Sequence, residues 1–147
     1  MTTDPGDPAT FRLTIAIRSD DLDVNGHVRG PAYLAYGDHA RWACLVAAGV
    51  DPARLRTHHG VGPVNLETTI RYHRELLPLG EVEVTCEFHW RDGKTSRVRQ
   101  ELRNPDGLLA AEIRSTSGLL DLTHRRLVED PARYWRLEAT NPHLLNL

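Results

Sequence analysis

The chain has 147 residues, of which 40% are hydrophobic and 26% are charged, a composition typical of a globular domain large enough to bury a core. Its 18 basic residues are balanced by 20 acidic ones, and the net charge of -2 gives no overall field to attract nucleic acid. No apolar run approaches the roughly 18 residues of a membrane helix, and the first ten residues lack the basic and hydrophobic parts of a signal peptide. We therefore expect a cytoplasmic protein that binds neither nucleic acid nor membrane.

The chain begins with a polar segment, residues 1–10, which contains two prolines and is expected to be a flexible leader. Residues 11–18 then alternate apolar and polar side chains, which is the period of a half-buried strand. Residues 11–137 are expected to form a single domain. Residues 138–147 form a C-terminal tail that either docks on this domain or frays.

The strongest helical pattern runs from Gly30 to Gly49, with Pro31 in the first turn and Gly49 as the C-terminal cap. Its predicted buried stripe consists mostly of small side chains: Tyr33, Gly37, Ala40, Cys44, Ala47 and Ala48. Small residues predict close contact with another element. Gly37 costs about 1 kcal/mol relative to alanine inside a helix, so we expect a packing reason for it. Cys44, and Cys86 in a later strand, are expected to be reduced packing residues.

Four further strands are predicted, separated by turns that contain glycine or proline: residues 64–73, 82–90, 97–103 and 108–121. The turns at residues 91–94 and 104–107 are typical of hairpins, so the later strands should form an antiparallel meander. Residues 51–62 are expected to be a connection that could hold a short helical turn. Residues 130–135 are expected to form a short helix.

This order of elements predicts an α+β fold in which a curved antiparallel five-stranded sheet wraps around one long helix. The reason is that one helix cannot cover both faces of a five-stranded sheet, and a curled sheet buries more of its apolar face. A free sheet edge or an uncovered apolar strip would favour a symmetric homodimer or homotetramer.

The loop before the long helix carries Asp23, and this position has a chemical meaning. The first helical turn has unpaired backbone N–H groups and a partial positive charge, which stabilise an oxygen that develops negative charge. A carboxylate beside these groups can attack a carbonyl that they hold, or direct water at it. Gly30 would let a ligand approach the backbone. Aspartates ahead of helices also cap their own loops, so this structural interpretation stays open beside the catalytic one.

The motif D-x-D-V-N-G-H-V from Asp21 to Val28, followed by Y-L-x-Y from Tyr33 and A-R from Ala40, resembles the hotdog-fold acyl thioesterases of the 4-hydroxybenzoyl-CoA thioesterase type. The order of elements agrees with that family over roughly residues 11–128. The resemblance implies a hotdog fold and hydrolysis of an acyl-CoA or acyl-carrier-protein thioester to free acid and thiol. We expect no cofactor and no metal.

The same resemblance places the catalytic aspartate at Asp23 and the amide that polarises the thioester carbonyl at Gly30. Asn25 and His27 match groups that support the aspartate in plant acyl-carrier-protein thioesterases. His27 could orient the aspartate or substrate, or satisfy a loop carbonyl, and Asn25 is expected mainly to stabilise the loop. Asp38 stands where the family has a glutamate.

Substrate-binding candidates lie on the helix and on the later strands. Tyr33 could line an acyl pocket or belong to the core. Several basic side chains could meet the phosphates of coenzyme A through charge-assisted hydrogen bonds: Arg71, Arg74, Lys94, Arg97 and Arg99. Of these, Arg97 and Arg99 are the prediction. No spacing of histidines indicates a metal site.

Two other functions stay open. Hotdog dehydratases and hydratases resemble D-x-N-P-x-H, whereas this chain has D-V-N-G-H from Asp23 to His27, without the proline and with one residue less between aspartate and histidine. A non-catalytic protein that binds an acyl ligand could use the same groove without turnover, since a fold does not fix its function.

Overall fold

The computed structural model describes residues 10–147, so all but the last residue of the expected leader lies outside the described residues. The elements in chain order are β1 (Phe11–Ala16), η1 (Ser19–Asp21), α1 (Gly30–Ala47), α2 (Pro52–His59), β2 (Val61–Tyr72), β3 (Glu81–Trp90), β4 (Thr95–Arg103), β5 (Leu109–Asp121), β6 (Arg126–Leu127), α3 (Pro131–Glu138) and η2 (Pro142–Leu145). The expected strands and long helix are confirmed, with ends shifted by a few residues. The connection after α1 holds a full helix, α2, because Asp51 caps it by accepting a hydrogen bond from the Ala53 N–H at 2.9 Å.

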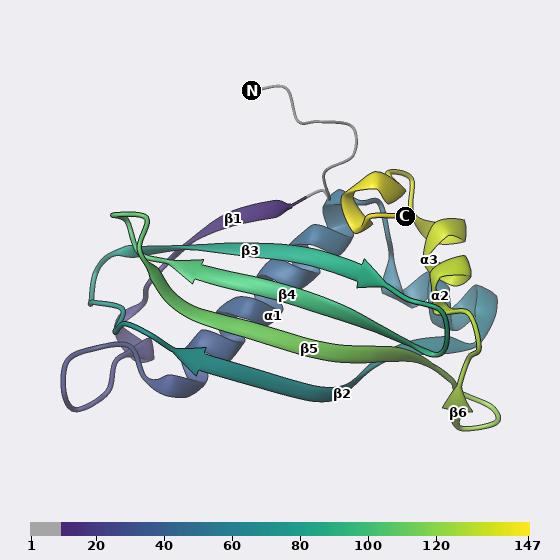
Figure 1. The fold of residues 1–147 in the computed structure, drawn as a ribbon, viewed down its shortest axis with the longest axis horizontal. Coiled ribbons are helices and arrows are strands. Elements are labelled where there is room, and N and C mark those ends of the chain that lie inside the picture. Colours follow the sequence, from purple (N-terminus) through teal and green to yellow (C-terminus); the bar gives the residue numbers. More distant parts are fainter. Residues whose placement is uncertain (1–9) are drawn as a thin grey trace.

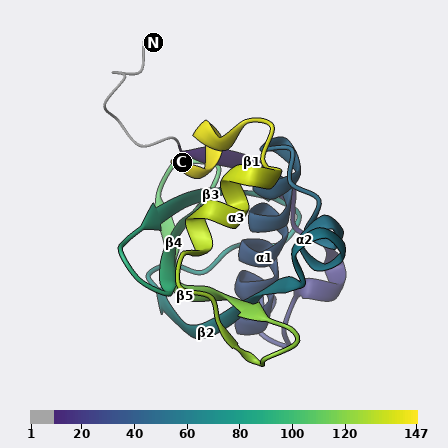
Figure 2. The ribbon, with the colours of Figure 1, turned by 90° about the vertical axis from the view of Figure 1, so that its right-hand side faces the viewer.

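All strand pairs are antiparallel, and the five long strands lie in the order β1-β3-β4-β5-β2, with β6 paired to β5 (Figure 1). The predicted meander is therefore confirmed as β3-β4-β5. Figure 2 shows the strands curving around α1, which confirms the expected α+β class. Figure 1 looks onto the other face of the sheet, which no helix of the described residues covers.

The predicted contact face of α1 lies against the sheet, with one exception. Ala47 is exposed, so its place on the buried stripe is wrong. The buried side of the helix moves from Ala32 and Tyr36 near its start to Leu45 and Ala48 near its end. Because the sheet is twisted, a straight helix meets it along a line that rotates around the helix surface.

Gly37 has the packing reason that the sequence predicts. A Cβ at this position would lie 2.7 Å from Ile113 Cδ1 and 3.2 Å from Gln100 Oε1, both on the sheet. Gln100 is buried, and its Nε2 donates a 2.7 Å hydrogen bond to the Gly37 carbonyl. Glycine therefore allows α1 to approach the sheet closely enough for this buried amide to be paired.

The C-terminal residues dock on the domain, which decides between the two expected alternatives. Leu145 is fully buried, and its carbonyl accepts a 2.6 Å hydrogen bond from Trp90 Nε1. The Asn141 N–H donates to the Ala48 carbonyl at 2.9 Å, and Gly49 follows with the positive φ of 78° expected of a helix cap. Together with α2 and α3, this segment closes one end of the sheet (Figure 2). The domain bounds given above stay predictions.

Glu138 holds α3 against α2 through contacts with the side chains of Arg54 and His59. Its Oε2 accepts a 3.1 Å hydrogen bond from Arg54 Nε, and its Oε1 lies 3.0 Å from His59 Nε2. The carboxylate is only 7% exposed. Burial tends to raise the pKa of Glu138, but the contacts with His59 and Arg54 outweigh this effect and lower the pKa below its ordinary value.

A lowered pKa makes the ionised Glu138 a stabilising group. Its contribution is present above the ordinary glutamate pKa of about 4.3 and is lost as pH falls through the lowered folded-state pKa. We expect Glu138→Gln to lower the Tm by a few degrees at neutral pH, and to lose less Tm than the wild type between about pH 5 and about pH 3. Circular dichroism melts measure both quantities. Glu129→Gln, which changes an 85% exposed carboxylate, is the control. Equal pH dependence in wild type and Glu138→Gln would show that this carboxylate does not stabilise the fold.

Candidate active site

The loop between η1 and α1 is closed by the carboxylate of Asp23. Its Oδ1 accepts hydrogen bonds from the Asn25 N–H at 2.9 Å and the His27 N–H at 3.3 Å. The Asp23 N–H in turn donates to the His27 carbonyl at 2.9 Å. Oδ1 of Asp23 therefore caps the backbone of its own loop, which is the structural role that the sequence also allowed.

The other oxygen of the same carboxylate faces His27. Oδ2 of Asp23 lies 3.2 Å from His27 Nδ1, and His27 Nε2 lies 3.4 Å from Glu75 Oε2. The Asp23 side chain is 29% exposed and that of His27 is 33% exposed. The contact with the imidazole therefore fixes the position of Oδ2, and this oxygen remains accessible to a molecule that enters from solvent.

Gly30 opens α1 with an unpaired backbone N–H. The preceding Arg29 is extended, with φ of -68° and ψ of 147°, and no side chain caps the helix. Among the described residues, the Gly30 N–H donates no hydrogen bond. The carbonyl of the same residue accepts a 3.1 Å hydrogen bond from the Tyr72 hydroxyl, which fixes the start of the helix against β2. This N–H is the kind of donor that a developing oxyanion needs.

Asp23, His27 and Gly30 meet at one shallow, open cavity of about 400 Å³. Its other lining residues are Val28, Tyr33, Tyr72, His73, Arg74 and Glu75. Asn25 does not line the cavity: it is exposed, and only its backbone N–H contacts Asp23. A carboxylate and a free amide on one cavity can act on the carbon and the oxygen of the same carbonyl group.

Tyr33 belongs to both the core and the cavity wall. Its ring is 3% exposed and lies edge-on to Tyr72, with ring centroids 5.1 Å apart. Its hydroxyl accepts from the Leu76 N–H at 2.9 Å and donates to the Arg74 carbonyl at 3.4 Å. Burial is the main cause that raises the pKa of Tyr33, so the phenol stays protonated. Tyr33 therefore anchors the segment of residues 74–76, of which Arg74 and Glu75 line the cavity.

Comparison with known proteins identifies the family. The model of the "Thioesterase-like superfamily" matches residues 17–137. The chain belongs to this superfamily. A search of curated proteins finds the long-chain acyl-CoA thioesterase FadM of Escherichia coli, 26% identical over 113 residues that cover 76% of this chain and 84% of FadM.

Solved structures agree with the hotdog thioesterase fold. The probable thioesterase YbaW of Escherichia coli superposes with a TM-score of 0.73 and 25% identity, over 81% of this chain and 89% of YbaW. A 1,4-dihydroxy-2-naphthoyl-CoA thioesterase from Synechocystis superposes with a TM-score of 0.81 at 14% identity, over 95% of this chain and 98% of its own. The expected hotdog fold and thioesterase family are confirmed.

The structure separates the two arginines predicted to bind substrate from the Asp23 cavity of this thioesterase. Arg97 and Arg99 are exposed on β4, whereas their neighbours Val98 and Gln100 are buried on the side of α1. Side chains alternate along a strand, so both arginines lie on the uncovered face of the sheet. They line a different groove, which shares no residue with the Asp23 cavity. Asp38 is also elsewhere, paired with Arg41 on the surface of α1 at 2.5 Å.

Two residues of the site are not identified by the sequence pattern. Tyr72 lies at the end of β2 and reaches Gly30, and Glu75 lies in the following loop and reaches His27. Both contacts join segments more than forty residues apart, which no local periodicity can reveal. Among residues 10–147, no group of three or more histidine, cysteine, aspartate or glutamate side chains is arranged to hold a metal ion, and no helix is long and apolar enough to cross a membrane.

Proposed function

We propose that this thioesterase hydrolyses acyl-CoA thioesters with Asp23 and the Gly30 N–H as its two catalytic groups. The observation that carries this proposal is that a partly exposed carboxylate and an unpaired first-turn amide line the same cavity. The names of the related FadM and Synechocystis enzymes support coenzyme A as the thiol part of the substrate.

In the proposed reaction, the thioester carbonyl oxygen accepts a hydrogen bond from the Gly30 N–H. Negative charge then develops on this oxygen at the positive end of α1, where it is stabilised. Asp23 acts either as a general base that removes a proton from the attacking water, or as a nucleophile that forms a mixed anhydride and releases the thiol. In the first route, the tetrahedral intermediate expels the thiolate, which takes up the proton that Asp23 removed from water. In the second route, water hydrolyses the anhydride, regenerates the Asp23 carboxylate and supplies the proton of the thiol. The products of both routes are the free acid and the thiol.

His27 is proposed as a positioning residue, since it contacts Oδ2 of Asp23 at 3.2 Å. Asn25 is proposed to act only through the loop, because its contact with Asp23 is made by the backbone. A single turnover in oxygen-18 water separates the two routes for Asp23. Label in the Asp23 carboxylate requires the anhydride, and its absence favours the general base.

The direct test of the function is thiol release from a panel of acyl thioesters. The panel should span short, long and aromatic acyl groups on coenzyme A and on an acyl carrier protein. Thiol release supports the proposal. Hydration of a crotonyl thioester without thiol release would favour a hydratase instead. Binding of the panel with no reaction would favour a non-catalytic acyl-binding protein.

The enzyme is proposed to act as a symmetric dimer that pairs through β2. This strand is at the edge of the sheet, and its outer edge pairs with no strand of the described residues. Leu66 on β2 is 50% exposed, although it is large and apolar. A second copy that pairs antiparallel along β2 would satisfy the free backbone groups and cover this side chain.

Such pairing would also join two cavities that lie at opposite ends of β2. Tyr72 lines the Asp23 cavity, whereas Asn65 lines a cavity of about 200 Å³ between α1 and the sheet. All three tryptophans of the chain line this second cavity: Trp42, Trp90 and Trp135. In an antiparallel pair, the Asn65 end of one copy lies beside the Tyr72 end of the other. We propose that the acyl group occupies this tryptophan-lined cavity of the second copy.

A charge placed on the free edge should weaken the dimer. We expect the wild type to sediment at about twice the chain mass of 16.6 kDa, and Leu66→Lys to shift towards the monomer because two copies of the charge would meet at the edge. Analytical ultracentrifugation over a concentration series measures the shift. Val46→Lys, at a 67% exposed position of α1, is the control. A wild-type monomer at all concentrations would contradict this assembly.

The cytoplasmic location expected from the sequence stays a prediction.

A further inference from the structure

The uncovered face of the sheet carries a groove of about 670 Å³ whose lining is rich in arginine. Strands β2, β4 and β5 and the turn after β3 contribute five guanidinium groups to it: Arg71, Arg91, Arg97, Arg99 and Arg114. Two glutamates also line it, Glu67 and Glu112. The groove is therefore positive although the whole chain has a net charge of -2.

Three of the five arginines have no acidic partner among the described residues. Among the described residues, Arg71, Arg91 and Arg97 form neither an ion pair nor a side-chain hydrogen bond. Arg99 and Arg114 lie directly opposite each other on β4 and β5. Like charges at directly opposed positions destabilise a sheet. The Glu112 carboxylate, whose pKa is lowered by its contact with His73 and by the charges of Arg114 and Arg99, offsets only part of this repulsion between two cations. The groove thus has several unused donors and a like-charge pair at its centre.

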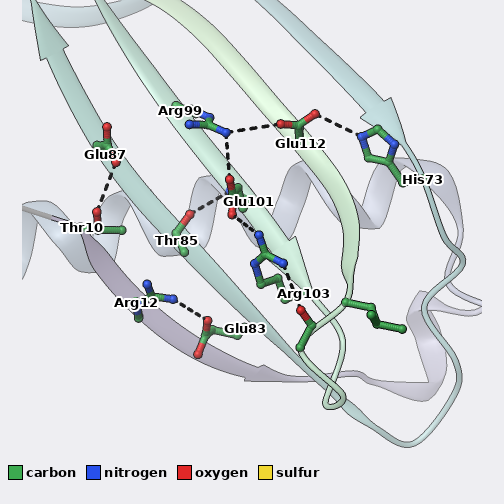
Figure 3. A network of polar contacts seen from close by, with 12 residues as sticks. Thr10, Arg12, His73, Glu83, Thr85, Glu87, Arg99, Glu101, Arg103 and Glu112 are labelled. Carbon is green, nitrogen blue, oxygen red and sulfur yellow. Dashed lines mark hydrogen bonds and ion pairs between the residues drawn. The ribbon is translucent and has the colours of Figure 1, made fainter. Parts of the chain in front are cut away.

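Arg99 is already oriented for binding by its neighbours. Its NH2 group donates to Glu101 Oε1 at 2.9 Å and lies 3.6 Å from Glu112 Oε1. Nη2 of Arg103 donates a 2.7 Å hydrogen bond to the other oxygen of Glu101, Oε2 (Figure 3). This network fixes one edge of the Arg99 guanidinium. A fixed, planar guanidinium loses little freedom when it binds a phosphate with two hydrogen bonds.

The groove begins where the Asp23 cavity ends. Glu112 in the groove lies 3.1 Å from the Nε2 of His73, which lines the Asp23 cavity, as Figure 3 shows. Arg71 in the groove directly precedes Tyr72 in the cavity, and adjacent residues of a strand face opposite sides of a sheet. Arg114 pairs with Thr69, two residues from Arg71, which corresponds to about 7 Å along the strand. A flexible substrate arm could therefore span both places.

We propose that this groove binds the phosphate groups of the coenzyme A part of the substrate, with Arg99 and Arg114 at its centre. The inference rests on the proposed acyl-CoA thioesterase function and adds a binding site for the end of the substrate that does not react. Coenzyme A carries a diphosphate and a 3′-phosphate, so its charge is complementary to this cluster of arginines. Arg97, Arg91 and Arg71 surround the central pair. The substrate then passes around the Tyr72 end of β2, and its thioester lies in the Asp23 cavity on the α1 side of the sheet.

The test compares two substrates that share one acyl group, acyl-CoA and the acyl thioester of N-acetylcysteamine, which has no phosphate. For Arg97→Gln/Arg114→Gln we expect the KM for acyl-CoA to rise about tenfold or more with kcat unchanged, since charge-assisted hydrogen bonds are lost. The KM for the N-acetylcysteamine thioester should not change. Within residues 10–147, neither replaced side chain is close enough to a carboxylate to form an ion pair, and Arg114 acts on Glu112 only through its charge, so the fold should persist. Arg56→Gln, which removes an exposed arginine of α2, is the matched control and should leave both KM values unchanged.

An unchanged KM for acyl-CoA in the double variant overturns the inference. An equal rise for both substrates also overturns it, because the arginines would then act without the phosphates. A rise with an acyl-carrier-protein thioester but not with acyl-CoA would assign the groove to the carrier protein instead. If the wild type hydrolyses neither substrate, the proposed function fails, and calorimetry with coenzyme A still tests the groove. Wild-type binding that is lost in the double variant would uphold it, and no binding by the wild type would refute it.

Discussion

Asp23→Asn is expected to lower kcat for thioester hydrolysis by roughly 10²- to 10⁴-fold, the usual effect of removing a positioned acid-base group. The asparagine keeps an oxygen where Oδ1 accepts the Asn25 and His27 N–H groups, so the loop and the Tm should change little. It has no negative charge with which to attack a carbonyl or remove a proton from water. Steady-state release of coenzyme A measures the loss.

Asp21→Asn is the matched control for this variant. Asp21 lies two residues earlier, as the last residue of η1, and its Oδ2 accepts a 2.8 Å hydrogen bond from the Tyr36 hydroxyl. It does not line the Asp23 cavity. An asparagine can accept the same hydrogen bond, so kcat should stay within a few-fold of the wild type. A loss in Asp21→Asn as large as that in Asp23→Asn would show that both changes act through the structure of the loop.

Gly30→Pro is expected to lower kcat by roughly 10²- to 10³-fold, because it removes the one N–H that would stabilise the oxyanion. Proline suits the first position of a helix, and the preceding Arg29 already has the extended conformation that a following proline requires. The KM should change less than kcat, since the lost hydrogen bond strengthens mainly in the transition state.

Gly30→Ala distinguishes loss of the N–H from crowding by a side chain, because alanine keeps the N–H and adds a Cβ. A Cβ at this position lies 3.3 Å from the Tyr72 hydroxyl oxygen, which must move by a few tenths of an ångström. The N–H is kept, so kcat should remain within a few-fold of the wild type. If Gly30→Ala is as slow as Gly30→Pro, crowding against Tyr72 explains both and the amide is not the oxyanion donor.

The elements of this fold could be predicted because their signals are local. Residues 11–16 alternate in burial as the sequence alternates, and α1 begins and ends close to Pro31 and Gly49. The exposure of Ala47 could not be predicted, because it depends on how the twisted sheet meets the end of α1. Helix α2 was expected only as a turn, since eight residues give a weak periodic signal.

Only the part of the candidate site that lies within one short sequence motif could be predicted. Asp23, His27 and Gly30 are close in sequence, and the structure brings them to one cavity. Tyr72 and Glu75 come from the far end of β2 and the loop beyond it, so their contacts depend on the tertiary fold. The arginine groove could not be predicted without the strand register, which decides which arginines lie next to each other.

Arg91 and Arg114 are the two groove arginines that the sequence analysis did not single out. Only the pairing of β4 with β5 places Arg114 opposite Arg99. Arg91 follows the end of β3 in a turn that the sequence marks only as a hairpin. A single exposed arginine reads as a solvated surface residue, and its meaning appears only when neighbours from other strands are known.

Single-turnover release of thiol, with enzyme in excess over acyl-CoA, tests the central role of Asp23 most directly because it reports the chemical step without product release. The wild type and Asp21→Asn are expected to release thiol with rate constants within a few-fold of each other. Asp23→Asn is expected to be at least about a hundredfold slower at saturating enzyme. A wild-type rate constant in Asp23→Asn would remove this carboxylate from the mechanism.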